Sequence, residues 1–170
     1  MIRQTAFALL ATAGITAAHA ASGVYLGPSV GIMDADANGF DDATNAGVLL
    51  GYEFFSKQQF YLSVEGELTT TVSDGDVKIA GQKGDWDIDT RAAFLAARVG
   101  DTFYIKVRYG AAWSDVSVKV AGFSASDSDS SVSWGGALGW NITPEWALQA
   151  DGTRIDSDVN YWSLGVLYRF

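Results

Sequence analysis

The stretch Asn160 to Phe170, NYWSLGVLYRF, shows the clearest alternation of apolar and other residues near the end of the chain. Counted back in twos from the terminal aromatic residue, one set of positions is apolar and bulky: Phe170, Tyr168, Val166, Leu164 and Trp162. The positions between them carry mostly small or polar side chains. A period of two places each set on one side of a pleated strand, so this stretch predicts a β-strand with one apolar face.

Seven earlier stretches show the same alternation, at residues 24–33, 47–54, 60–69, 86–97, 103–114, 132–142 and 146–153. Short turns follow the second, fourth and sixth of them, at residues 56–59, 99–101 and 143–145. Longer polar segments follow the first, third and fifth, at residues 34–45, 73–83 and 125–131, and only residues 156–158 precede the last strand. This rhythm predicts an all-β fold, an eight-stranded antiparallel up-and-down transmembrane β-barrel with both termini on the periplasmic side.

The first twenty residues have a different pattern. Arg3 is followed by an uncharged run over residues 5–18, and the segment ends in Ala18-His19-Ala20. A charged start, a short apolar centre and an A-x-A site predict a secretory signal peptide over residues 1–20, with the barrel over residues 21–170. The alternative, a buried N-terminal helix, is disfavoured because small residues dominate where a core helix would carry Leu and Ile.

A soluble lipocalin-like barrel shows the same alternation with its faces reversed. The less apolar face is rich in Gly, Ser and Ala, for example Ser133, Gly135, Ala137 and Gly139, whereas a surface facing water favours charged side chains. Small residues suit the crowded interior of a narrow barrel, so we expect the bulky face to contact lipid. The chain has no cysteine and a net charge of −9, which excludes a disulfide framework and disfavours a nucleic-acid partner.

Aromatic residues cluster at the strand ends, as in the girdles of membrane barrels. From Phe103 to Trp113 is roughly 33 Å along a strand, and a tilt of about 40° reduces this to roughly 25 Å of height. This height matches the apolar band of an outer-membrane barrel. The predicted girdle residues are Trp86, Trp113, Trp134 and Trp162 at the loop end and Phe103, Trp140, Trp146 and Tyr168 at the turn end.

Charged residues fall on the face assigned to the interior. An eight-stranded barrel is only wide enough for its own side chains, and buried charges need partners. We therefore predict an interior cluster of ion pairs formed by Glu65, Glu67, Arg91, Lys106 and Arg108. Such a cluster fills and orients the barrel, or, as the alternative, it gates a narrow path for ions or small solutes.

The first polar segment contains Asp34-Ala35-Asp36-Ala37-Asn38-Gly39, which matches the opening of the D-x-[DN]-x-[DN]-G calcium loop. The match fails at the twelfth position, where Asn45 replaces the bidentate Glu, and strands flank the segment in place of helices. A solvated acidic loop is the simpler interpretation. We predict no cofactor other than a candidate Ca²⁺ site at Asp34, Asp36 and Asn38.

A terminal strand that ends LGVLYRF, together with the strand rhythm and the signal segment, resembles the small eight-stranded outer-membrane barrels of the OmpA membrane domain and OmpX type. The resemblance implies that Tyr168 and Phe170 form the signal read by the barrel-assembly machinery. It also implies a bacterial outer-membrane location, with lipid and lipopolysaccharide as partners and a monomeric state. Lipopolysaccharide phosphates would meet the acidic loops through divalent ions, although solubility alone explains such loops.

Two classes of function follow. One is a barrel with a structural or surface-interaction role, and the other is a narrow channel. The enzymes among small outer-membrane barrels use a histidine, whereas the only histidine of this chain, His19, lies in the predicted signal segment. The sequence therefore predicts a protein that is not an enzyme.

Overall fold

The computed structural model describes residues 23–36, 39–79, 81–120 and 123–170. Nine strands form one antiparallel sheet in this part of the chain, which contains no helix long and apolar enough to cross a membrane. The strands are β1 (Val24–Ala35), β2 (Ala43–Lys57), β3 (Phe60–Ser73), β4 (Gly75–Ile79), β5 (Gln82–Gly100), β6 (Phe103–Val120), β7 (Phe123–Asn141), β8 (Trp146–Asp156) and β9 (Val159–Arg169).

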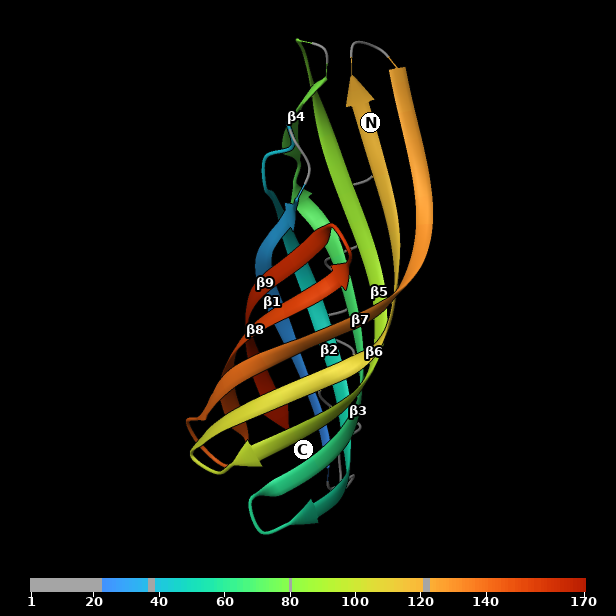
Figure 1. The fold of residues 1–170 in the computed structure, drawn as a ribbon. Helices are drawn as coiled ribbons and strands as arrows, with labels where there is room; N and C mark the ends of the chain where they lie inside the picture. Colours follow the sequence, from blue (N-terminus) through green and yellow to red (C-terminus); the bar gives the residue numbers. More distant parts are fainter. Residues whose placement is uncertain (1–22, 37–38, 80, 121–122) are drawn as a thin grey trace.

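All the strands except β4 close into a barrel (Figure 1). Strands next to each other in the chain pair as hairpins, except β3 and β4. In addition β1 pairs with β9, and β3 pairs with β5. The predicted eight-stranded antiparallel barrel is therefore confirmed. The predicted signal peptide lies outside the described residues.

The turn end of the barrel matches the prediction. The β2–β3, β5–β6 and β7–β8 connections are short and lie together at the lower end in Figure 1. Gly100 ends β5 with a φ of 119°, which L-residues rarely adopt, and a side chain there would also collide with the backbone of Phe103. This glycine is needed for the tight β5–β6 turn.

The loop end differs from the prediction, because two of the three expected loops are largely strand. Residues 73–83 contain β4 and the start of β5, and residues 125–131 lie in β7. The first loop is also shorter, since β1 runs to Ala35 and β2 begins at Ala43. Ser and Asp favour a turn at residues 125–131, but this segment pairs throughout with residues 112–118 of β6, where Val116 and Val118 alternate with polar residues.

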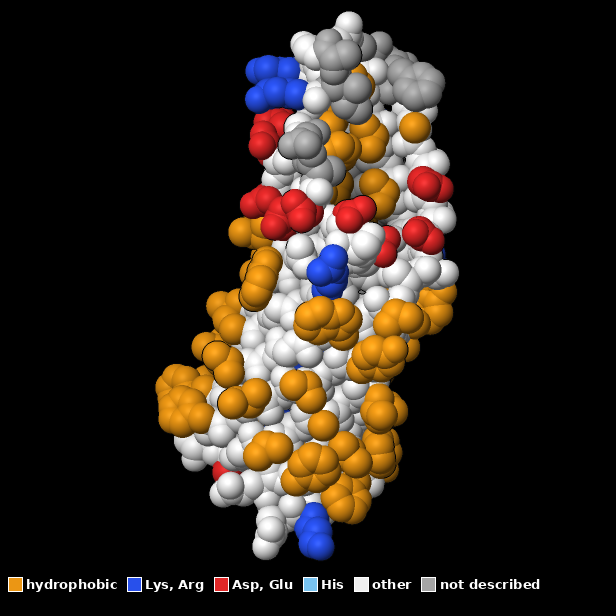
Figure 2. All heavy atoms as spheres, in the orientation of Figure 1, with side chains coloured by type: hydrophobic (Ala, Val, Ile, Leu, Met, Phe, Trp, Pro, Cys, Tyr) orange, Lys and Arg blue, Asp and Glu red, His pale blue; other side chains and the backbone are white. Residues whose placement is uncertain are grey.

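The outer and inner faces are opposite in character. On β6 the outward Phe103 and Tyr109 are 71% and 63% exposed, whereas the inward Lys106 and Arg108 are 2% and 3% exposed. Figure 2 shows the apolar outer band, with acidic and basic side chains above it toward the loop end. A soluble barrel would bury the apolar set, so this arrangement contradicts the lipocalin-like alternative.

Candidate functional site

The middle of the barrel holds a network of buried charges, here called the interior charge cluster: Glu65, Glu67, Lys106, Arg108 and Asp151. Lys106 Nζ lies 2.8 Å from Glu65 Oε1, and Arg108 Nη1 lies 2.7 Å from Glu67 Oε2. Asp151 Oδ1 lies 3.8 Å from Lys106 Nζ and 3.9 Å from Arg108 Nη2. The five side chains thus join three strands, β3, β6 and β8, across the interior.

Strand alternation and one small residue position the cluster. Glu65 and Glu67 are two residues apart on β3, and Lys106 and Arg108 are two apart on β6, so both pairs face inward. The strand between them is β5, where Ala96 is the direct partner of Arg108. Its methyl group leaves room for the long side chains to meet over β5. The Arg108 guanidinium also lies 4.5 Å from the centre of the Phe94 ring.

Neutral side chains provide further hydrogen bonds to the cluster. Tyr25 donates a 2.5 Å hydrogen bond to Glu65 Oε1, and Arg108 Nε donates a 3.0 Å bond to Thr153 Oγ1. Gln149 Nε2 donates to both carboxylate oxygens of Asp151. Buried ion pairs are tolerated when their polar atoms are satisfied in this way. Glu65 Oε2 is the exception, because it has no hydrogen-bond partner among the described residues and lies 3.8 Å from Arg108 Nη1.

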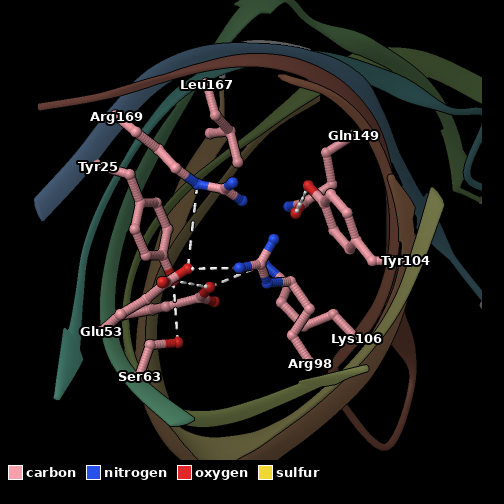
Figure 3. A pocket seen from close by; sticks show the side chains of 10 residues that line it. Tyr25, Glu53, Ser63, Arg98, Tyr104, Lys106, Gln149, Leu167 and Arg169 are labelled. Carbon is pink, nitrogen blue, oxygen red and sulfur yellow. Dashed lines mark hydrogen bonds and ion pairs between the residues drawn. The ribbon is translucent and has the colours of Figure 1, made fainter. Parts of the chain in front are cut away.

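A second group of charges lies nearer the turn end. Arg98 Nη2 lies 2.9 Å from Glu53 Oε1, and Arg169 Nε lies 3.9 Å from the same oxygen. Figure 3 shows both guanidinium groups pointing into the interior beside a small pocket. This turn-end pocket has a volume of about 10 Å³ and is lined by Tyr25, Glu53, Arg98, Tyr104, Lys106 and Arg169, among others. It has room for about one water molecule.

The interior toward the loop end is apolar. Met33, Ile88, Ile155 and Tyr161 are almost completely buried there, and Trp86 packs among them. The Trp86 indole donates a 2.7 Å hydrogen bond to the Asp41 backbone oxygen. Phe40, in the β1–β2 connection, packs edge-on against Trp86 at 5.7 Å between ring centres. This apolar layer covers the interior charge cluster on the loop side.

Two predicted site residues lie on the face of the sheet opposite to the one predicted. Arg91 lies on the outer surface, 2.9 Å from the exposed Asp115, so its assignment to the interior cluster is wrong. Trp86 is only 2% exposed and points inward, so its assignment to the aromatic girdle is also wrong. Both errors have one cause. The bulk of Trp86, Ile88 and Phe94 predicts that their face of β5 contacts lipid, whereas these side chains are buried in the barrel interior.

The structure brings Glu65, Glu67, Lys106 and Arg108 together and adds residues that the sequence argument missed. Arg98 replaces Arg91 as the inward arginine of β5. The pairing of Arg91 with Trp113, a predicted outward residue, would have revealed the face, because directly paired residues share a side of the sheet. Arg169 was also detectable, since it alternates with the outward Tyr168 in the terminal strand.

The other girdle residues lie on the outer surface. Trp113, Trp134 and Trp162 are exposed toward the loop end, and Phe103, Trp140 and Trp146 toward the turn end. Tyr168 is partly exposed and packs edge-on against both Trp146 and Phe170, with 4.9 Å between ring centres in each case. These contacts place aromatic rings along the turn-end rim beside the last residue of the chain.

The candidate calcium site cannot be assembled from the described residues. Asn38 lies outside them, and no group of three or more His, Cys, Asp or Glu side chains within them is arranged to hold a metal ion. Calcium binding at Asp34, Asp36 and Asn38 stays a prediction.

Comparison with known families supports the same fold. Residues 5–170 match the family model described as outer membrane protein beta-barrel domain. No curated protein matches the sequence.

Several solved structures share the fold at low sequence identity. The attachment invasion locus protein Ail of Yersinia pestis is 21% identical, with a TM-score of 0.57, over 88% of this chain and 99% of Ail. OprG of Pseudomonas aeruginosa is 15% identical, with a TM-score of 0.65, over 88% of this chain and 96% of OprG. Neisserial surface protein A is 16% identical, with a TM-score of 0.59, over 89% of this chain and all of that protein.

Proposed function

This chain belongs to the outer membrane protein β-barrel family, and we propose that it is a structural outer-membrane barrel that is closed to solutes. The loop-side ends of β5, β6 and β7, here called the raised sheet, make contacts outside the cell. The interior charge cluster is the observation that carries the proposal. Its side chains are at most 8% exposed and link three strands across the barrel. An interior filled in this way favours a closed structural barrel over a transport channel.

The apolar layer supports the same function. It lies between the interior charge cluster and the loop end, so a solute entering from outside would have to displace the packed Trp86, Ile88 and Tyr161 before reaching that cluster. A narrow channel would need both layers to open. We therefore keep conduction as the alternative that measurement must exclude.

The raised sheet supports the surface-interaction part of the proposal. Strands β5, β6 and β7 are each longer than β8 and β9, and their ends rise above the rest of the barrel (Figure 1). This raised sheet carries acidic side chains, including Asp85, Asp127 and Asp129. One Ail structure holds the heparin analogue sucrose octasulfate. An acidic sheet favours cationic partners, or phosphates bridged by divalent ions, over such a polyanion.

The orientation and the partners of the barrel are part of the same proposal. We place both termini and the short turns in the periplasm and the raised sheet outside. The outward apolar band is expected to contact lipid and lipopolysaccharide in a monomeric barrel. Tyr168 and Phe170, on the turn-end rim, are the proposed signal for the barrel-assembly machinery. No catalytic role is proposed, because the mature chain would hold no histidine.

Cysteine labelling tests the orientation, since the chain has no native cysteine. Ser126→Cys places a thiol on the raised sheet, and Gln58→Cys places one in the β2–β3 turn. In intact cells a membrane-impermeant maleimide should label the first variant and should label the second only after lysis. Labelling of Gln58→Cys alone in intact cells would reverse the orientation and remove the raised sheet from the cell exterior.

A further inference from the structure

The turn-end pocket contains a buried guanidinium nitrogen without a partner. The Arg98 side chain is 93% buried, with a relative exposure of 7%, and its Nη1 has no hydrogen-bond partner among the described residues. Its Nη2 is already bonded to Glu53. Arg98 Cζ lies over the rings of Tyr61 and Tyr104, 3.9 and 4.9 Å from their centres, and Figure 3 shows the guanidinium pointing into the interior.

The charges around the pocket have a positive excess. Arg98, Lys106 and Arg169 line it together with only two carboxylates, Glu53 and Glu65. Glu53 Oε1 serves both arginines, and Lys106 is bonded to Glu65. Lys106 is also compensated by Asp151, 3.8 Å away in the interior charge cluster, and Glu67 is bonded to Arg108 there. The uncompensated charge therefore lies at Arg98 and Arg169, which share Glu53. The side facing the turn end is therefore electropositive.

An ion can reach the pocket from the turn end. Glu53 and Arg169 are 15% and 22% exposed, whereas Lys106 and Glu65, deeper in the barrel, are almost fully buried. The volume of about 10 Å³ admits one species of about the size of a water molecule and excludes organic anions. A small anion in a recess of low dielectric and net positive charge gains more than it would at an open surface.

We propose that the turn-end pocket is a binding site for a single small monovalent anion of the halide class. The anion accepts hydrogen bonds from Arg98 Nη1 and the Arg169 guanidinium. It neutralises the positive excess and ties the ends of β5 and β9 together through Glu53 on β2.

Chloride-35 NMR of the full-length mature barrel in detergent micelles tests the site. A saturable line broadening above that of empty micelles is expected for wild type. Arg98→Gln should weaken chloride affinity about tenfold or more, the effect of losing one hydrogen bond to a charged group. Arg91→Gln, which removes the same charge from the outer surface, is the matched control and should leave the broadening unchanged.

The wild-type measurement decides the question even if Arg98→Gln fails to fold. No broadening above empty micelles would mean that the pocket holds only solvent, and the proposal would be overturned. Equal broadening in wild type and a folded Arg98→Gln would place the chloride elsewhere and overturn it as well. Arg169→Gln is the second variant, at a more exposed position, and should also reduce the affinity. Unchanged affinity in that variant would contradict the assigned geometry.

Discussion

The Arg108 guanidinium on β6 lies 2.7 Å from the Glu67 carboxylate on β3, although β5 runs between the two strands. The contact is possible because Ala92, the direct partner of Glu67 on β5, has a side chain too small to separate them. The pair therefore links strands that share no backbone hydrogen bonds. Loss of this pair should therefore destabilise the whole barrel.

Removal of Arg108 tests the strength of this link. Arg108→Met should lower the free energy of unfolding by about 3–5 kcal/mol, because it leaves Glu67 as a buried charge without its partner. Arg91→Met, which breaks the exposed pair with Asp115, should change it little. Urea unfolding of both variants in phospholipid vesicles measures the difference. Equal effects would mean that the interior charge cluster contributes no more than a surface pair.

Tyr104 requires a glycine opposite it. A side chain at Gly139 would overlap the Tyr104 ring, which itself donates a hydrogen bond to Gln149. Gly139→Ala should therefore destabilise the barrel by about 1–3 kcal/mol, the usual effect of overpacking. Gly66 is the matched control, since a methyl group there meets nothing within 4 Å. The same vesicle unfolding assay should show no loss for Gly66→Ala, and a loss equal to that of Gly139→Ala would contradict the packing.

Quenching by brominated lipid separates inward from outward tryptophans. In variants that keep one tryptophan each, Trp162 and Trp134 should be strongly quenched because they lie on the lipid side, 63% and 55% exposed. Trp86 should be protected by the apolar layer. Strong quenching of Trp86 would mean that β5 is reversed and would restore the assignment made from its sequence.

Acid should release a contact on the raised sheet. Asp115 lies on the loop side of Trp113, and hydrogen bonds from Ser128 and then Arg91 hold the pKa of its carboxyl below the ordinary value. Because the pKa of Asp115 is lowered on folding, its contacts stabilise the folded state fully at pH values above the ordinary carboxyl pKa of about 3.9. This stabilisation is lost as the pH falls through the pKa of the folded state. Carboxyl NMR titration should show this low midpoint, and Ser128→Ala should raise it. An unchanged midpoint in Ser128→Ala would contradict the bond.

The barrel could be predicted because the alternation of apolar with small or polar residues is a local property of each strand. The terminal strand shows this alternation most clearly. The face of β5 was not predictable in the same way. Residues 92–97 read Ala-Ala-Phe-Leu-Ala-Ala, so both faces are apolar there and alternation cannot separate them. The assumption of a polar interior then failed because Trp86 and Ile88 fill an apolar layer. Only the cross-strand register with Trp113 and Tyr109 resolves the ambiguity.

The charged residues could be predicted only where the strand around them was unambiguous. Lys106 and Arg108 follow from the clear alternation of β6, and Glu65 and Glu67 from that of β3. Arg98 could not be found by local pattern, since it follows the doubly apolar segment. The extent of the raised sheet was also hidden, because Ser and Asp favour turns locally whereas pairing with residues 112–118 is a contact between strands.

Conductance in planar lipid bilayers tests most directly whether the barrel is closed. Purified wild-type protein, inserted and verified by its different gel mobility before and after boiling, should give no unitary currents. Arg108→Met and Glu65→Gln serve as comparisons, because they disturb the charge cluster but leave the apolar layer intact, and they should also be silent. Steady unitary currents through the wild-type protein would contradict the structural role and establish the narrow channel in its place.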